Sequence, residues 1–191
     1  MGSNGSISTE EFIRSIHLFS HLAKQNMEGK FVDEIADGAI SFVQMNLMNV
    51  LGTHPGRTVG DVAKYMNVSY PAATKTIDKL VRLGYLKRKE DTRDRRIAHL
   101  FLTPSGQKVV DKYSEYREEQ LMRVKNRFDG EGARVLNNHL LDLARAFLDE
   151  MGVAEGACLQ CGVFNPDHCK INGSGDCGYM VSLGRGRAEQ V

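Results

Sequence analysis

The middle of the chain carries two short helix patterns, joined by a tight turn and followed by two strand patterns. The helices are predicted over residues 59–66 and 70–83, and Ser69 is placed to cap the second one. The strands are predicted at residues 85–88 and 97–102, with a charged turn between them. This order predicts a helix-turn-helix followed by a β-hairpin wing.

Helical patterns also flank this motif on both sides. Recurring apolar residues, with Gly29 as a break between the first two helices, predict helices over residues 9–27, 31–38, 41–51, 104–127 and 132–151. The expected fold is mainly α, a winged helix-turn-helix with long dimerisation helices, a small β-hairpin wing and a cysteine-rich metal-binding tail. We predict four domains. They are the N-terminal dimerisation helices at residues 1–40, the winged helix-turn-helix at 41–103, the C-terminal dimerisation helices at 104–151 and the cysteine-rich metal-binding tail at 152–191.

Positive charge is concentrated around the winged motif. The whole chain has a net charge of +1, whereas residues 57–108 contain 12 Lys or Arg and 5 Asp or Glu, a net charge of +7. A basic segment between acidic flanks indicates a surface that meets a polyanion. No apolar run approaches the roughly 20 residues of a membrane-spanning helix, and the N-terminus lacks a signal-peptide pattern. We therefore expect a cytoplasmic protein without a membrane partner.

Two short signatures stand in the basic segment, DTRDRR at residues 91–96 and LTPSG at residues 102–106. With the surrounding residues 61–106, they resemble the MarR family of winged-helix transcription regulators, whose wing carries D-x-x-D-R-R followed by L-T-x-x-G. The resemblance extends over residues 8–151. It implies a homodimeric regulator, a repressor, that binds a pseudo-palindromic site on double-stranded DNA. It also implies a small-molecule pocket, often for aromatic acids, between the dimer helices and the winged domain.

The second helix of the motif and the hairpin tip are the predicted DNA contacts. A recognition helix places its early residues against base edges in the major groove, which here are Ser69, Tyr70, Ala72, Ala73, Thr74, Lys75 and Thr76. Lys79 is placed for a phosphate. At the hairpin tip, arginines can enter the minor groove, and the candidates are Arg93, Arg95 and Arg96. The resemblance implies that Asp94 and Arg96 set the wing and its contact; the alternative is that the arginines only pair with Asp91 and Asp94.

The flanking helices carry more apolar surface than a small winged domain can cover. We therefore expect a homodimer, in which a two-fold axis would space two recognition helices about 34 Å apart, one turn of DNA. The residues of an effector pocket stay unknown. Five residues could line such a pocket, although apolar residues at such positions belong more often to the core: Phe12, His17, Phe42, Met45 and Met48.

Catalytic and helical metal sites are not indicated. His17 and His21 lie four residues apart, a spacing at which two histidines of one helix can coordinate a metal ion. A metal site needs three or four ligands, however. Residues of the core or of a pocket are therefore the favoured interpretation of this pair. No catalytic motif occurs, so we do not expect an enzyme.

A Gly-rich stretch near the C-terminus holds all four cysteines, Cys158, Cys161, Cys169 and Cys177, in the spacing C-x2-C-x7-C-x7-C. Four thiolates this close predict a metal site. The open spacing of the last two favours an iron–sulfur cluster, of the [4Fe–4S] type. Zinc is the alternative, reactive thiols or disulfides are a third possibility, and His168 could replace one ligand.

The two metals predict different functions for the tail. A cluster would make the regulator a sensor of redox state, oxygen or nitric oxide, because such oxidants damage it. Zinc would only fold the tail, and release from DNA would then depend on a small effector at the dimer interface. A further alternative is a redox carrier that does not bind DNA.

Overall fold

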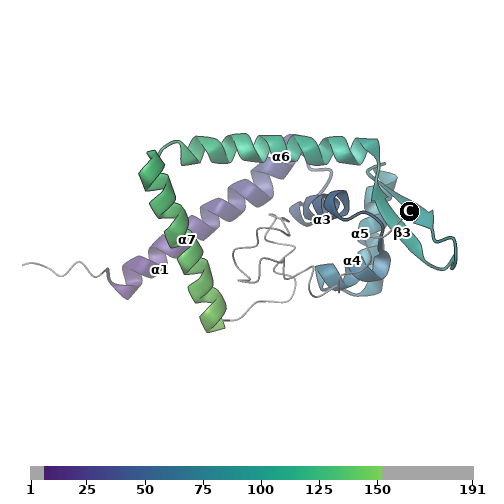
Figure 1. The fold of residues 1–191 in the computed structure, drawn as a ribbon, viewed down its shortest axis with the longest axis horizontal. Coiled ribbons are helices and arrows are strands. Elements are labelled where there is room, and N and C mark those ends of the chain that lie inside the picture. The colour runs from purple at the N-terminus through teal and green to yellow at the C-terminus, as the bar shows by residue number, and fades with distance from the viewer. Residues whose placement is uncertain (1–6, 152–191) are drawn as a thin grey trace, which may run out of the picture.

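A computed structural model describes residues 7–151 of the chain (Figure 1). In chain order the elements are α1 (Thr9–Lys24), the π-helix η1 (Gln25–Lys30), α2 (Phe31–Ala36), α3 (Phe42–Thr53), β1 (Arg57–Thr58), α4 (Val59–Met66), α5 (Tyr70–Arg82), β2 (Leu86–Glu90), β3 (Ala98–Leu102), α6 (Pro104–Lys125) and α7 (Gly130–Met151). The mainly helical fold with a small sheet confirms the predicted winged helix-turn-helix. The predicted metal-binding tail lies outside the described residues.

The helix-turn-helix begins and ends where its capping residues predict. Thr58 and Asp61 cap α4 reciprocally, each side chain accepting a hydrogen bond from the other's backbone N–H. Asn67 ends this helix with a φ of 49°, a left-handed conformation that Asn tolerates. Ser69 then caps α5, its Oγ accepting from the N–H of Ala72 at 3.4 Å. Local chemistry alone therefore sets the turn between α4 and α5.

The sheet has three antiparallel strands in the order β1-β3-β2. Arg57 of β1 pairs with Leu100 of β3, and Lys89 of β2 pairs with His99. We call residues 86–102 the wing; it comprises β2, β3 and the loop between them. The pairing of β1 with β3 joins the wing to the segment that precedes α4.

The predicted break at Gly29 is wrong, because the chain stays helical through it. Residues 25–30 form a π-helix, in which the N–H of Phe31 reaches the carbonyl of Asn26, five residues earlier. Gly29 has open space where a Cβ would lie and does not adopt a positive φ. The following helix ends instead at Asp37 and Gly38, which have φ values of 47° and 67°.

One hydrophobic core lies between α3, α4, α5, the base of the wing and the first half of α6. Its large, fully buried side chains include Met45, Leu47, Met48, Ile77, Leu80, Leu100 and Tyr113. Phe31 and Val32 of α2 join it from the N-terminal side, and Phe31 packs edge-on against Tyr116 of α6 with ring centroids 5.5 Å apart. The core therefore crosses the boundaries predicted at residues 40 and 103, and the division into domains stays a prediction.

Long helices extend away from this core. In Figure 1, α6 runs from the wing at one end of the molecule to α7 at the other, and α1 slants across the space between. α1 has no buried residue. Its apolar side chains and those of late α6, α7 and the turn between them are exposed, among them Phe12, Phe19, Leu22, Leu121, Phe128, Leu136, Leu140 and Phe147. Among the described residues, none of the helices is long and apolar enough to cross a bilayer.

Candidate nucleic-acid interface

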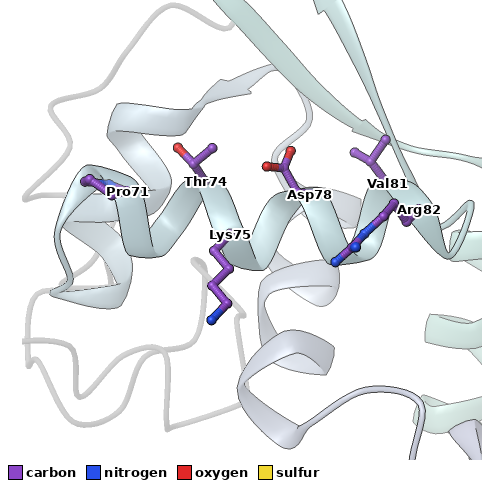
Figure 2. A pocket seen from close by; sticks show the side chains of 6 residues that line it. All are labelled: Pro71, Thr74, Lys75, Asp78, Val81 and Arg82. Atoms are coloured by element: carbon purple, nitrogen blue, oxygen red, sulfur yellow. The ribbon is translucent and has the colours of Figure 1, made fainter.

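Helix α5 presents one face to the core and the other to solvent. Ala73, Ile77 and Leu80 are fully buried at helical spacing. The opposite side borders an open groove, lined by Pro71, Thr74, Lys75, Asp78, Val81 and Arg82. Figure 2 shows Thr74 and Asp78 rising from one edge of this face and Lys75 projecting from the other. The outer face of α5 is thus polar and basic, as a helix that enters the major groove requires.

Most residues predicted to meet DNA lie on the solvent side of α5. Ser69, Tyr70, Ala72 and Lys75 are exposed, whereas Thr74 and Thr76 are half-buried. The Thr74 hydroxyl donates to the Tyr70 carbonyl at 2.9 Å, and the Thr76 hydroxyl donates to the Ala72 carbonyl at 3.2 Å. Each hydroxyl oxygen therefore has a lone pair for an outside donor. The base contacts themselves stay predictions.

Ala73 and Lys79 are placed differently from what the sequence reasoning assumed. Ala73 has no exposed surface, so its methyl group packs in the core and does not reach a base. The Lys79 ammonium donates to Gln44 Oε1 at 3.2 Å, at the N-terminus of α3. It ties α5 to α3, and a phosphate contact from Lys79 would be shared with Gln44.

The outer face of α5 also contains residues that the sequence prediction missed. That prediction treated residues 69–76 as one block, although only every third or fourth position of a helix shares a face. Asp78 and Arg82 lie four and eight residues after Thr74, on the same face of the helix, and both line the groove. Asp78 forms a salt bridge of 2.7 Å with Arg88 of β2. Both side chains are partly exposed, so this pair orients the two groups more than it stabilises the fold.

The wing loop is ordered by two aspartates that bind its own backbone. Asp91 Oδ1 accepts hydrogen bonds from the N–H groups of Arg93 at 2.7 Å and Asp94 at 3.0 Å. Asp94 Oδ1 accepts from the N–H of Arg96 at 2.9 Å. Within residues 7–151, the salt bridges do not include the guanidinium groups of the three loop arginines, which are exposed. The aspartates thus shape the loop and leave the arginine charges available to a phosphate or a groove.

His99 joins the wing to the turn before β1. Its Nδ1 lies 2.7 Å from the Gly56 carbonyl oxygen, and its Nε2 lies 2.9 Å from Asp91 Oδ2. The hydrogen bond to Asp91, helped by the one to Gly56, raises the pKa of His99 above 6.5. The same His99 bond, with the N–H groups of Arg93 and Asp94, lowers the pKa of Asp91 to about 2. Nothing in the sequence signature points to this pairing.

The LTPSG signature forms the junction between the winged domain and α6. The Thr103 hydroxyl donates to the Gly84 carbonyl at 2.5 Å and accepts from the N–H of Gly106 at 3.0 Å, so it caps α6 and binds the turn that follows α5. At Gly106, a Cβ would lie 2.1 Å from the Tyr85 carbonyl oxygen. The first turn of α6 therefore touches backbone at a distance that only glycine permits.

The remaining predicted sites are not assembled by the described residues. Cys158, Cys161, Cys169 and Cys177, with His168, lie outside residues 7–151. Within the described part of the chain, no group of three or more His, Cys, Asp or Glu side chains could hold a metal ion. Of the residues that could line an effector pocket, Met45 and Met48 are fully buried in the core, whereas Phe12 and His17 are exposed on α1.

Comparison with known sequences finds that the helix-turn-helix and the first part of the wing are similar to one family. The sequence model of the MarR family matches residues 40–97. The chain is 28% identical over 98 residues to YpoP of Bacillus subtilis (strain 168), which is named an uncharacterized HTH-type transcriptional regulator. This match covers 51% of the chain and 67% of YpoP.

Comparison with solved structures extends the likeness to most of the described chain. FabT of Streptococcus pneumoniae, solved in complex with DNA, aligns with 74% of this chain and 96% of its own, at 24% identity and a TM-score of 0.55. RV1404 of Mycobacterium tuberculosis aligns with 80% of this chain and 100% of its own, at 19% identity and a TM-score of 0.66. The described residues therefore have the winged-helix fold of these structures, and residues 40–97 are similar in sequence to the MarR family.

Proposed function

We propose that this protein is a homodimeric, DNA-binding transcriptional regulator that represses genes by occupying a pseudo-palindromic operator. The observation that carries the proposal is the exposed polar face of α5 beside a wing whose arginines are free of the loop's own carboxylates. The surrounding residues 57–108 have a net charge of +7, which attracts the DNA backbone. FabT, which shares the fold, was solved in complex with DNA.

Single substitutions on α5 and on the wing are expected to weaken DNA binding without unfolding the protein. For Lys75→Ala and Arg96→Ala, we expect a loss of about tenfold in affinity each, the size of one good groove contact. The measurement is fluorescence anisotropy at constant salt, with a duplex selected from a random library by the wild-type protein. Lys112→Ala on α6 is the charge-matched control. If all three variants bound the duplex with equal affinity, the result would contradict the roles assigned to Lys75 and Arg96.

The uncovered helices support a second copy of the chain as partner. Late α6 and early α7 border an open groove with an apolar floor, lined by Leu121, Val124, Lys125, Phe128, Gly130, Ala133, Arg134, Leu136, Asn137 and Leu140. Contiguous apolar faces of this kind mark interaction sites in soluble proteins. A two-fold dimer would cover them and would provide the two recognition helices that a pseudo-palindrome requires.

For the cysteine-rich extension we propose an iron–sulfur cluster that makes DNA binding depend on redox state. The support is the sequence alone: four cysteines in the spacing C-x2-C-x7-C-x7-C follow closely after α7. If the cluster holds the extension against the dimer helices, its loss would change the distance between the two recognition helices. If the site holds zinc instead, the extension is structural, and an effector bound at the dimer interface releases the DNA.

Purification without oxygen is expected to separate these two models. The cluster model predicts a coloured protein with about four iron and four sulfide per chain, both lost in Cys161→Ser. The variant should stay dimeric but lose its redox response in the DNA-binding assay. Ser174→Ala, a substitution in the same segment, is the matched control and should keep its iron. A colourless protein with about one zinc per chain would contradict the cluster.

A further inference from the structure

The ring of His99 is held between two acceptors. Nδ1 faces the Gly56 carbonyl at 2.7 Å, and Nε2 faces the Asp91 carboxylate at 2.9 Å. Neither oxygen can donate, so both ring nitrogens must carry a proton for both hydrogen bonds to exist. A neutral imidazole has only one N–H and would turn a lone pair towards one of the two oxygens. The geometry therefore belongs to the imidazolium form.

We propose that protonated His99 is a positioning residue for the wing, and that loss of its proton loosens the wing loop and weakens DNA binding. The imidazolium ties Asp91 Oδ2 to the carbonyl of Gly56, which precedes His99 by 43 residues and lies at the turn before β1. The other oxygen of Asp91 holds the N–H groups of Arg93 and Asp94. His99 thus acts on the loop arginines through Asp91 without touching DNA.

Charged groups from several elements surround His99. Asp91 at the end of β2 and Asp61 on α4 both favour the imidazolium. Lys89 of β2 is paired with His99 across the sheet, and on the other side His99 is paired with Thr58 of β1, next to Arg57. Both ring nitrogens are bonded to Gly56 and Asp91.

The direction of the pH effect follows from the shift of the His99 pKa. Because hydrogen bonds in the folded protein raise this pKa, the stabilisation from the bridge is fully present below the pKa of His99 in the unfolded chain and is lost as pH rises through the folded-state pKa. Asp91 stays ionised throughout, since its pKa is lowered to about 2. The pKa of His54, which is near Gly56 in the sequence, is lowered by burial and by Arg57, the opposite direction from the shift of His99.

The wing itself can be tested without DNA. Carbon-detected NMR of the His99 ring gives its pKa, and trypsin cleavage after Arg93, Arg95 and Arg96 reports opening of the loop. Cleavage is normalised at each pH by a peptide of residues 90–98. Between pH 6 and pH 8.5 we expect cleavage of the wild type to rise about threefold to tenfold, with the midpoint of the His99 titration. His99→Gln should open readily at both pH values, and His21→Gln on α1 should behave as wild type.

The consequence for DNA rests on the proposed function and is measured separately. With the duplex selected by the wild-type protein, affinity should fall about threefold to tenfold more for the wild type than for His99→Gln over the same pH range. The proposal would be overturned if DNA affinity had the same pH dependence in both proteins, or if wing cleavage did not follow the titration of His99. A wild-type protein that selects no DNA would refute the regulator function, while the cleavage profile would still decide the role of His99.

Discussion

Gly106→Ala is expected to lower the free energy of unfolding by about 3 kcal/mol or more, a large part of the stability of a domain this size. The added Cβ would lie 2.1 Å from the carbonyl oxygen of Tyr85 and 3.1 Å from a methyl group of Leu102. The Leu102 side chain can rotate away, but the Tyr85 carbonyl belongs to the backbone that enters β2. Relief therefore requires the first turn of α6 to move away from the winged domain.

The measurement is urea unfolding followed by circular dichroism, with Gly60→Ala as the control. Gly60 also lies in the first turn of a helix, but its nearest neighbour, Thr58 Oγ1, would be 3.7 Å from a new Cβ. We expect this control to be neutral or stabilising by up to about 1 kcal/mol, since Ala is the better helix former. If both variants unfold at the wild-type urea concentration, the close contact at Gly106 does not exist in solution.

If the protein is the proposed dimer, Leu136→Glu combined with Leu140→Glu is expected to convert it to a monomer and to reduce DNA affinity by at least about 100-fold, because two half-sites are then bound independently. Both leucines are nearly two-fifths exposed on α7 and line the groove shared with late α6. Carboxylates at these positions would be desolvated in a dimer interface and would face their symmetry mates. In an isolated chain they reach solvent, so the fold itself should survive.

Sedimentation equilibrium at micromolar concentration measures the dimer, and anisotropy measures the DNA affinity. Asn138→Glu is the matched control, since it adds a carboxylate to an exposed position on the opposite face of α7. We expect this control to stay dimeric and to bind DNA as the wild type does. A double variant that remains dimeric would show that another surface holds the two copies together.

Local patterns in the sequence predict most of the fold. Ser69, Thr58 and Thr103 cap α5, α4 and α6 because a short side-chain oxygen can bind an N–H two or three residues ahead, without help from distant parts of the chain. Strands β2 and β3 begin and end within two residues of the predicted bounds, whereas β1 is not among the predicted elements. At Gly29 the local rule fails, since neighbouring helical turns carry the chain through as a π-helix.

The candidate site was less predictable because burial selects among residues of similar chemistry. Ala73 and Ala72 look equivalent in the sequence, yet Ala73 packs in the core and Ala72 is exposed. Lys75 projects freely from α5, whereas Lys79 is bound to Gln44 on α3. Helical periodicity identifies the face that includes Asp78 and Arg82, but only packing shows which face points outward.

The sequence by itself determined the helix-turn-helix, the wing and the basic character of the surface, because caps, turns and charge act over a few residues. The tertiary structure decided which contacts join these parts. The bridge from His99 to Gly56 and the approach of Gly106 to Tyr85 link residues far apart in the chain. Contacts of this kind depend on how elements pack, and no local pattern encodes them. They set how the wing is held and how α6 leaves the domain, the two features on which the geometry of DNA binding would depend.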